Sequence, residues 1–126
     1  MAQTILLYSV PVELHREITK ICNGLGIDTK KIAKKRFLQP IGCHACLPGF
    51  EQTASWYEGQ DLPSPMIIFS GLSDTMLDKY LYEYRQSGLP EIKYRAIVTK
   101  HNIHWTVLDL YQELVQERES FETAGR

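Results

Sequence analysis

The sequence predicts a single α/β domain in which two strand–helix–strand units follow one another. Two segments, residues 4–8 and 66–69, are apolar without alternation, a pattern typical of strands covered on both faces. Each is followed by apolar residues at helical spacing and then by a second strand-like segment. The chain has 126 residues, enough to bury roughly two-thirds of its unfolded surface in one core.

The first unit spans residues 4–33. Pro11 suits the first turn of a helix, where a missing backbone N–H costs nothing. Gly24 and Gly26 are suited to end that helix. Residues 27–33 form a weaker strand whose two lysines suit the edge of a sheet. The apolar stripe of the helix consists of Leu14, Ile18, Ile21, Cys22 and Leu25.

The second unit spans residues 65–100. Ser73 can accept hydrogen bonds from the free amides of a helical first turn. Gly88 is a left-handed stop for the helix, and Pro90 prevents the helix from resuming. Residues 92–98 form the last strand. The helical stripe consists of Leu77, Tyr80, Leu81 and Tyr84, which we interpret as helix–sheet packing.

The remaining segments are a connection and a carboxyl-terminal helix. Residues 34–64 form a long irregular connection rich in proline and glycine. Within it, residues 51–57 are expected to form a short helix that lays Trp56 on the core. The last helix is predicted from Trp105 to about Glu119, and residues 120–126 are expected to be a frayed tail.

Two right-handed units can be joined in two ways. A long crossover gives a parallel, doubly wound sheet, whereas a direct antiparallel join gives a ferredoxin-like α+β sheet. Because the apolar runs indicate strands buried on both faces, we favour a four-stranded, mainly parallel sheet of order 2-1-3-4 with a carboxyl-terminal helix.

Composition indicates a cytoplasmic protein without a membrane segment. The net charge of −1 gives no general attraction to nucleic acid or to an anionic membrane. No apolar run approaches the ~20 residues of a membrane helix, and no basic segment precedes the apolar residues 5–7, so we expect no signal peptide. Three cysteines are too few for a secreted disulfide scaffold and indicate a reducing compartment.

The second half of the chain contains a distinctive corner, Thr99-x-x-Asn102-x-x-Trp105, and further characteristic residues between about 62 and 115. This pattern resembles the prokaryotic family catalogued as domain of unknown function 3783, and the corner is its most specific part. Lys100 stands where the family pattern has a proline. The resemblance implies a small α/β domain in a bacterial or archaeal cytoplasm and no particular reaction. The other matching residues are Phe69-Ser70-Gly71, Leu77-Asp78, Gly88, Arg95-Ala96 and Glu113-Leu114.

Three turns follow the carboxyl ends of predicted strands. In a parallel sheet these turns would share one edge, where open α/β sheets bind ligands and helix amino ends offer free amides to anions. No glycine-rich phosphate loop is present. In the alternative interpretation, Thr99 and Asn102 only cap and tie the corner. The candidate residues for binding a small anion are Ser9, Ser70, Gly71, Thr99, Lys100 and Asn102.

The segment Cys43-His44-Ala45-Cys46 carries the sharpest chemical signal. Two thiolates at this spacing can share a zinc ion, which would need two further ligands such as His101 and His104. A redox pair is a second interpretation and two ordinary thiols a third. We expect two ordinary thiols, no metal and no cofactor.

The sequence contains no catalytic nucleophile–base set and no paired acids. We therefore expect a non-enzymatic interaction or ligand-binding module. The alternatives are a small anionic-ligand-binding protein or enzyme that uses the turns, and a Cys-x-x-Cys metal or redox protein. A protein partner or a small anionic ligand fits this interpretation. The five basic residues within 30–36 suit a solvated edge strand, and we expect no nucleic-acid partner.

Overall fold

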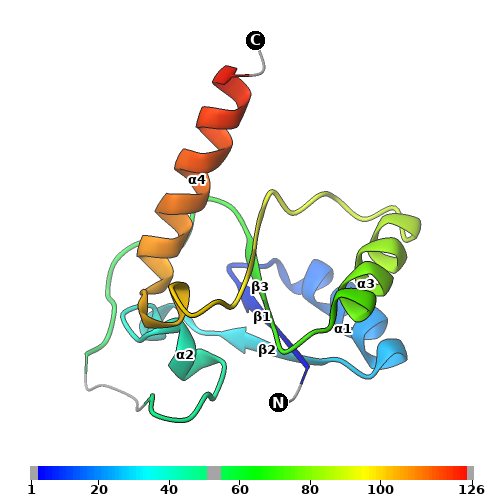
Figure 1. Cartoon of the computed structure of the whole chain (residues 1–126), viewed down its shortest axis with the longest axis horizontal. Coiled ribbons are helices and arrows are strands. Elements are labelled where there is room, and N and C mark those ends of the chain that lie inside the picture. Colours follow the sequence, from blue (N-terminus) through cyan, green and yellow to red (C-terminus); the bar gives the residue numbers. More distant parts are fainter. Residues whose placement is uncertain (1–2, 51–54, 125–126) are drawn as a thin grey trace.

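The computed structural model describes residues 3–50 and 55–124 as one four-stranded sheet with helices on both faces (Figure 1). The strands are β1 (Thr4–Tyr8), β2 (Asp28–Ile32), β3 (Met66–Ser70) and β4 (Tyr94–Ile97). The helices are α1 (Val12–Leu25), α2 (Ile41–His44), α3 (Asp74–Gln86) and α4 (Val107–Ala124). Two short 3-10 turns, η1 (Lys34–Arg36) and η2 (Asn102–His104), precede α2 and α4.

The strand order β2-β1-β3-β4 confirms the predicted order. β1 pairs with β2 and β3 with β4 in parallel, so the sheet is mainly parallel as predicted. The central pair, β1 with β3, is antiparallel. Thr4 lies opposite Ser70 and Tyr8 lies opposite Met66, so the two units meet head to tail rather than through a parallel crossover.

Both crossover helices lie on the same face of the sheet (Figure 1). Two right-handed units that meet antiparallel must place their helices on one face, whereas a parallel join would place them on opposite faces. The second face is covered by α4 and by the connection that carries η1 and α2. The three long helices therefore cover both faces, as expected, but α1 and α3 share one of them.

The central strands explain why the sequence shows no polar alternation. Leu6 and Ile68 pack on the face of α4, and their neighbours Leu7 and Ile67 pack on the face of α1 and α3. All four side chains are buried, because successive residues of a strand point to opposite faces and both faces are covered.

The expectation for Trp56 was wrong. Residues 51–54 lie outside the described residues, and Ser55 to Tyr57 are not helical. Trp56 is 54% exposed, with the Lys35 ammonium 5.3 Å from its ring centroid. The Tyr57 N–H donates to the Lys35 carbonyl at 2.9 Å, and the Tyr57 ring stacks on Phe37. Successive side chains of an extended segment diverge, so this anchor turns Trp56 outward.

The carboxyl-terminal segment is more regular than expected. α4 begins at Val107, with the Thr106 hydroxyl accepting the Asp109 N–H at 3.2 Å, and it continues to Ala124. Residues 120–124 are therefore helical and not frayed, and Arg118 pairs with Glu122 at 3.3 Å on successive turns. Figure 1 shows that the end of α4 extends well past the sheet.

Candidate ligand-binding site

The turn residues singled out from the sequence do not meet at one edge. Because β1 and β3 are antiparallel, Ser9 follows β1 at the end of the sheet opposite to Ser70. The Ser9 hydroxyl donates to the Asp61 carboxylate, which ties the connection to the end of β1. Gly71 adopts a left-handed backbone, with φ of 77°, in the turn after β3. The edge shared by all three turns is therefore absent, although the turns after the parallel strands β3 and β4 still lie at one edge.

Thr99 and Asn102 tie the corner after β4, as the alternative interpretation holds. The Asn102 Oδ1 accepts the Thr99 N–H at 2.9 Å, and its Nδ2 donates to the Ile97 carbonyl at 2.9 Å. The Thr99 hydroxyl in turn accepts the Asn102 N–H at 3.2 Å. Asn102 is buried while Lys100 is exposed, so the polar atoms of this corner are occupied by its own backbone.

The cysteines and histidines considered as metal ligands are spread over separate environments. Cys43 is buried in α2, whereas Cys46 is exposed beyond its end. His104 packs against the Phe50 ring at 5.3 Å, and His101 is exposed. Among the residues that the structure describes, no three side chains of metal-binding type come together.

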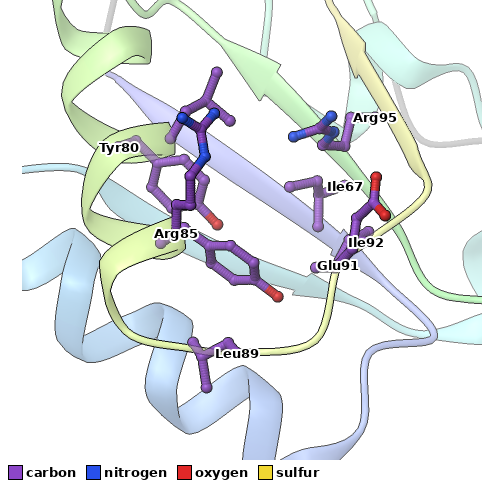
Figure 2. A pocket seen from close by; sticks show the side chains of 9 residues that line it. Ile67, Tyr80, Arg85, Leu89, Glu91, Ile92 and Arg95 are labelled. Carbon is purple, nitrogen blue, oxygen red and sulfur yellow. The ribbon is translucent and has the colours of Figure 1, made fainter.

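A better candidate site lies between the carboxyl-terminal half of α3 and the start of β4 (Figure 2). The hydroxyl of Tyr84 donates to the Pro90 carbonyl and holds the α3–β4 connection against the helix. Gly88, with φ of 69°, lets the chain turn there. The result is a cavity of about 230 Å³, lined by Ile67, Tyr80, Leu81, Tyr84, Arg85, Leu89, Glu91, Ile92 and Arg95.

Tyr80 supplies a polar atom without a partner. Its side chain is only 1% exposed, and its hydroxyl has no hydrogen-bond partner among the described residues. Figure 2 shows the hydroxyl pointing from α3 towards the strands. Burial raises the pKa of the Tyr80 hydroxyl well above its ordinary value, an effect that the Arg95 charge partly offsets. Tyr80 is therefore a neutral hydrogen-bond donor that faces the cavity.

Two arginines flank the same cavity from opposite elements. Arg85 extends from α3 and Arg95 from β4, as Figure 2 shows. Within residues 3–50 and 55–124, neither guanidinium forms a salt bridge. Glu91 on the rim is the one carboxylate that lines the cavity. Two unpaired cations and a buried donor around apolar walls can bind a small anion.

The comparison with protein families finds a match for this part of the chain. The family described as domain of unknown function (DUF3783) matches residues 65–121, which is less than half of the 126 residues. Neither a curated protein nor a solved structure matches the chain. The DUF3783 segment contains β3, α3, β4 and most of α4, so all nine residues that line the cavity lie inside it.

Sequence reasoning did not identify this site. Tyr80 and Tyr84 were interpreted as packing residues from their helical spacing, which also describes their buried rings. The residue in the sequence that could have pointed to this cavity is Arg95. Ile67 on the neighbouring strand faces the α1 and α3 side, and Arg95 lies opposite it in the register. Arg95 is exposed because β4 is an edge strand, so the register places its charge beside the helix-covered face without burying it.

Within the described part of the chain, no helix has the length and apolar composition needed to cross a membrane.

Proposed function

We propose that this protein is a non-enzymatic binding module that takes a small carboxylate in the cavity between α3 and β4. The observation that carries the proposal is the Tyr80 hydroxyl, which is buried and has no hydrogen-bond partner in residues 3–50 and 55–124, in a cavity that Arg85 and Arg95 also line. Leaving a buried hydroxyl unpaired costs roughly 1–3 kcal/mol. A ligand oxygen that accepts from it would recover this cost.

The cavity restricts the size and chemistry of the ligand. Its volume of about 230 Å³ lies below the range of drug-sized pockets, which begins at roughly 300 Å³. The walls formed by Ile67, Leu89 and Ile92 suit an apolar body. The two guanidinium groups suit one carboxylate, to which arginine donates in a bidentate manner. A compact monocarboxylate with a ring or a short chain meets both conditions.

Calorimetric titration with benzoate and with its neutral analogue benzamide tests the proposal. We expect benzoate to bind and benzamide to bind at least about tenfold more weakly, since hydrogen bonds to charged groups are worth roughly 1.5–3 kcal/mol. Arg95→Met and Arg85→Met should each weaken benzoate binding to a similar extent. Equal affinity for the two probes, or no binding of benzoate at millimolar concentration, would contradict the proposal.

Two further variants separate the site from general surface charge. Lys93→Met removes a nearby exposed cation that does not line the cavity, so it should leave benzoate affinity unchanged. Glu91→Gln removes the carboxylate on the rim and should strengthen benzoate binding roughly threefold, the effect expected of an exposed charge pair. A loss of affinity in Lys93→Met would show that binding follows net charge alone.

We also propose a bacterial or archaeal cytoplasmic location. All three cysteines are free thiols, a state typical of reducing compartments, and the family resemblance points to prokaryotes. Such a binding module would require a partner protein that distinguishes its ligand-bound form from its free form.

A further inference from the structure

A second cavity lies on the opposite face of the sheet, beside α2. It has a volume of about 390 Å³ and includes the start of β1 and β2, the end of β3 and the chain after α2. Its lining differs from that of the carboxylate cavity because it contains one thiol and the hydroxyl groups of serine and threonine, together with charges of both signs. These groups belong to Thr4, Asp28, Thr29, Lys30, Cys46 and Ser70.

Cys46 and Lys30 form the reactive part of this cavity. The Lys30 ammonium donates to the Cys46 sulfur at 3.1 Å and to the His44 carbonyl at 3.0 Å. The carbonyl contact fixes the ammonium beside the sulfur. Cys46 is exposed and has a left-handed backbone, with φ of 57°, which turns it out of α2. Exposed thiols beside a cation are the environment in which nucleophilic cysteines are found.

Ser70 independently indicates a ligand. The residue is buried, with only 3% of its surface exposed, and it lines the cavity. The residue lies at the end of β3, directly opposite Thr4 of β1, and both line the cavity. A buried hydroxyl at the wall of a cavity can exchange hydrogen bonds with a molecule that fills the cavity.

We propose that Cys46 is a modification site that exchanges with a low-molecular-weight disulfide derived from an amino acid. Lys30 can bind the carboxylate of such a molecule, and Asp28 can bind its ammonium group. The hydroxyls of Thr4 and Ser70 provide further hydrogen bonds. This site shares no residue with the carboxylate cavity, so the proposal does not rest on the proposed function.

The exchange step needs no external oxidant beyond the disulfide itself. The Cys46 sulfur, after giving its proton to solvent, attacks one sulfur of the disulfide. The bond between the two ligand sulfurs breaks as the bond to Cys46 forms, and the second half leaves as a thiolate that takes up a proton. Lys30 stabilises the negative charge on the attacking sulfur because its ammonium is 3.1 Å away.

The other two cysteines provide internal comparisons. Cys22 is fully buried between α1 and the sheet, and burial raises the pKa of its thiol to about 12. Cys43 is 7% exposed and lies 3.5 Å from the Gln39 Oε1, away from the cavity. Neither thiol is accessible in the folded protein, so modification of the native chain should be confined to Cys46.

Incubation of the folded protein with glutathione disulfide, followed by intact mass measurement and peptide mapping, tests the proposal. We expect one glutathione adduct at Cys46 and none at Cys22 or Cys43. Lys30→Met should slow the reaction about tenfold, the order expected from losing an adjacent charge. Cystamine, a disulfide without carboxylates, should be slowed less by this substitution, because it loses the stabilisation of the attacking sulfur but no carboxylate contact.

Matched variants decide between a built site and a merely exposed thiol. Lys31→Met removes the next lysine of β2, which does not line the cavity, and should leave the rate unchanged. Ser70→Val should slow the reaction with glutathione disulfide while Cys46 stays exposed. Circular dichroism confirms that each variant is folded. Equal labelling of Cys43 and Cys46, or equal rates in Lys30→Met and the unaltered protein, would overturn the proposal.

Discussion

The hydroxyl of Tyr8 donates a hydrogen bond to Nδ1 of His44 at 3.0 Å, and both side chains are fully buried. The other ring nitrogen of His44 donates to the Arg36 carbonyl at 2.8 Å. This assignment follows because a carbonyl can only accept, which leaves Nδ1 to accept from Tyr8. One neutral imidazole therefore connects β1, η1 and α2.

The first prediction concerns the pH dependence of stability. Burial lowers the pKa of His44 from 6.5 to about 4, with the Arg36 and Lys30 charges contributing to the decrease and the Arg36 carbonyl opposing it. Since the unfolded chain binds this proton more readily, the contribution is complete above about pH 6.5 and is lost as the pH falls towards 4. The loss amounts to roughly 3 kcal/mol in the free energy of unfolding.

Urea unfolding over this pH range measures the effect, and NMR titration of the imidazole protons assigns it. His44 should remain neutral until the pH approaches about 4. If His44 instead titrates near 6.5, the predicted burial of a neutral imidazole is incorrect.

The second prediction concerns the unpaired hydroxyl of Tyr80. Tyr80→Phe removes a buried group without a partner, so the free energy of unfolding of the unliganded protein should increase by about 1 kcal/mol. The same substitution should weaken benzoate binding. Tyr82→Phe on the same helix is the control, because Tyr82 is 58% exposed and should change neither quantity. A Tyr80→Phe protein that is less stable without ligand would mean that the hydroxyl already has a partner.

The third prediction concerns the corner after β4. Asn102→Ala removes the partners of the Thr99 N–H and the Ile97 carbonyl, so it should lower the free energy of unfolding by about 2 kcal/mol. His101→Ala changes the exposed neighbour and should have an effect near zero. Thermal unfolding of both variants provides the comparison. Similar midpoints would show that the turn is held without Asn102.

The fourth prediction uses two glycines near the end of α1. Gly24 is inside the helix with open space around it, so Gly24→Ala should stabilise the protein by roughly 0.5–1 kcal/mol. Gly26 ends the helix with φ of 73°, so Gly26→Ala should destabilise it by about 1 kcal/mol. Chemical denaturation measures both. Effects of the same sign would contradict the observed end of α1.

The predicted fold and the observed one differ mainly in the join between the two units. Residues 4–8 and 66–69 are covered on both faces in either arrangement, so their apolar runs predict burial but not strand direction. The connection between β2 and β3 is long enough to return along the sheet or to cross it. The apolar pattern therefore predicts the strand order 2-1-3-4 correctly but does not predict that the central strands β1 and β3 are antiparallel.

The candidate site was not predicted for a related reason. Its cavity depends on how the connection folds back against α3, and the anchor is a bond between the Tyr84 hydroxyl and the Pro90 carbonyl. Helical spacing places Tyr80 and Tyr84 on the buried stripe but does not reveal that one hydroxyl is paired and the other is not. Such pairing is set by tertiary geometry, which periodicity does not encode.

The sheet also acts as a partition. Ile67 of β3 borders the carboxylate cavity, while Ser70 of the same strand borders the thiol cavity on the other face. Two occupants would therefore not collide, and the cavities share no lining residue through which they could compete. Distant sites without shared partners usually contribute additively. Benzoate affinity should thus be the same before and after glutathionylation of Cys46. One protein molecule can therefore bind benzoate and carry the glutathione adduct at the same time.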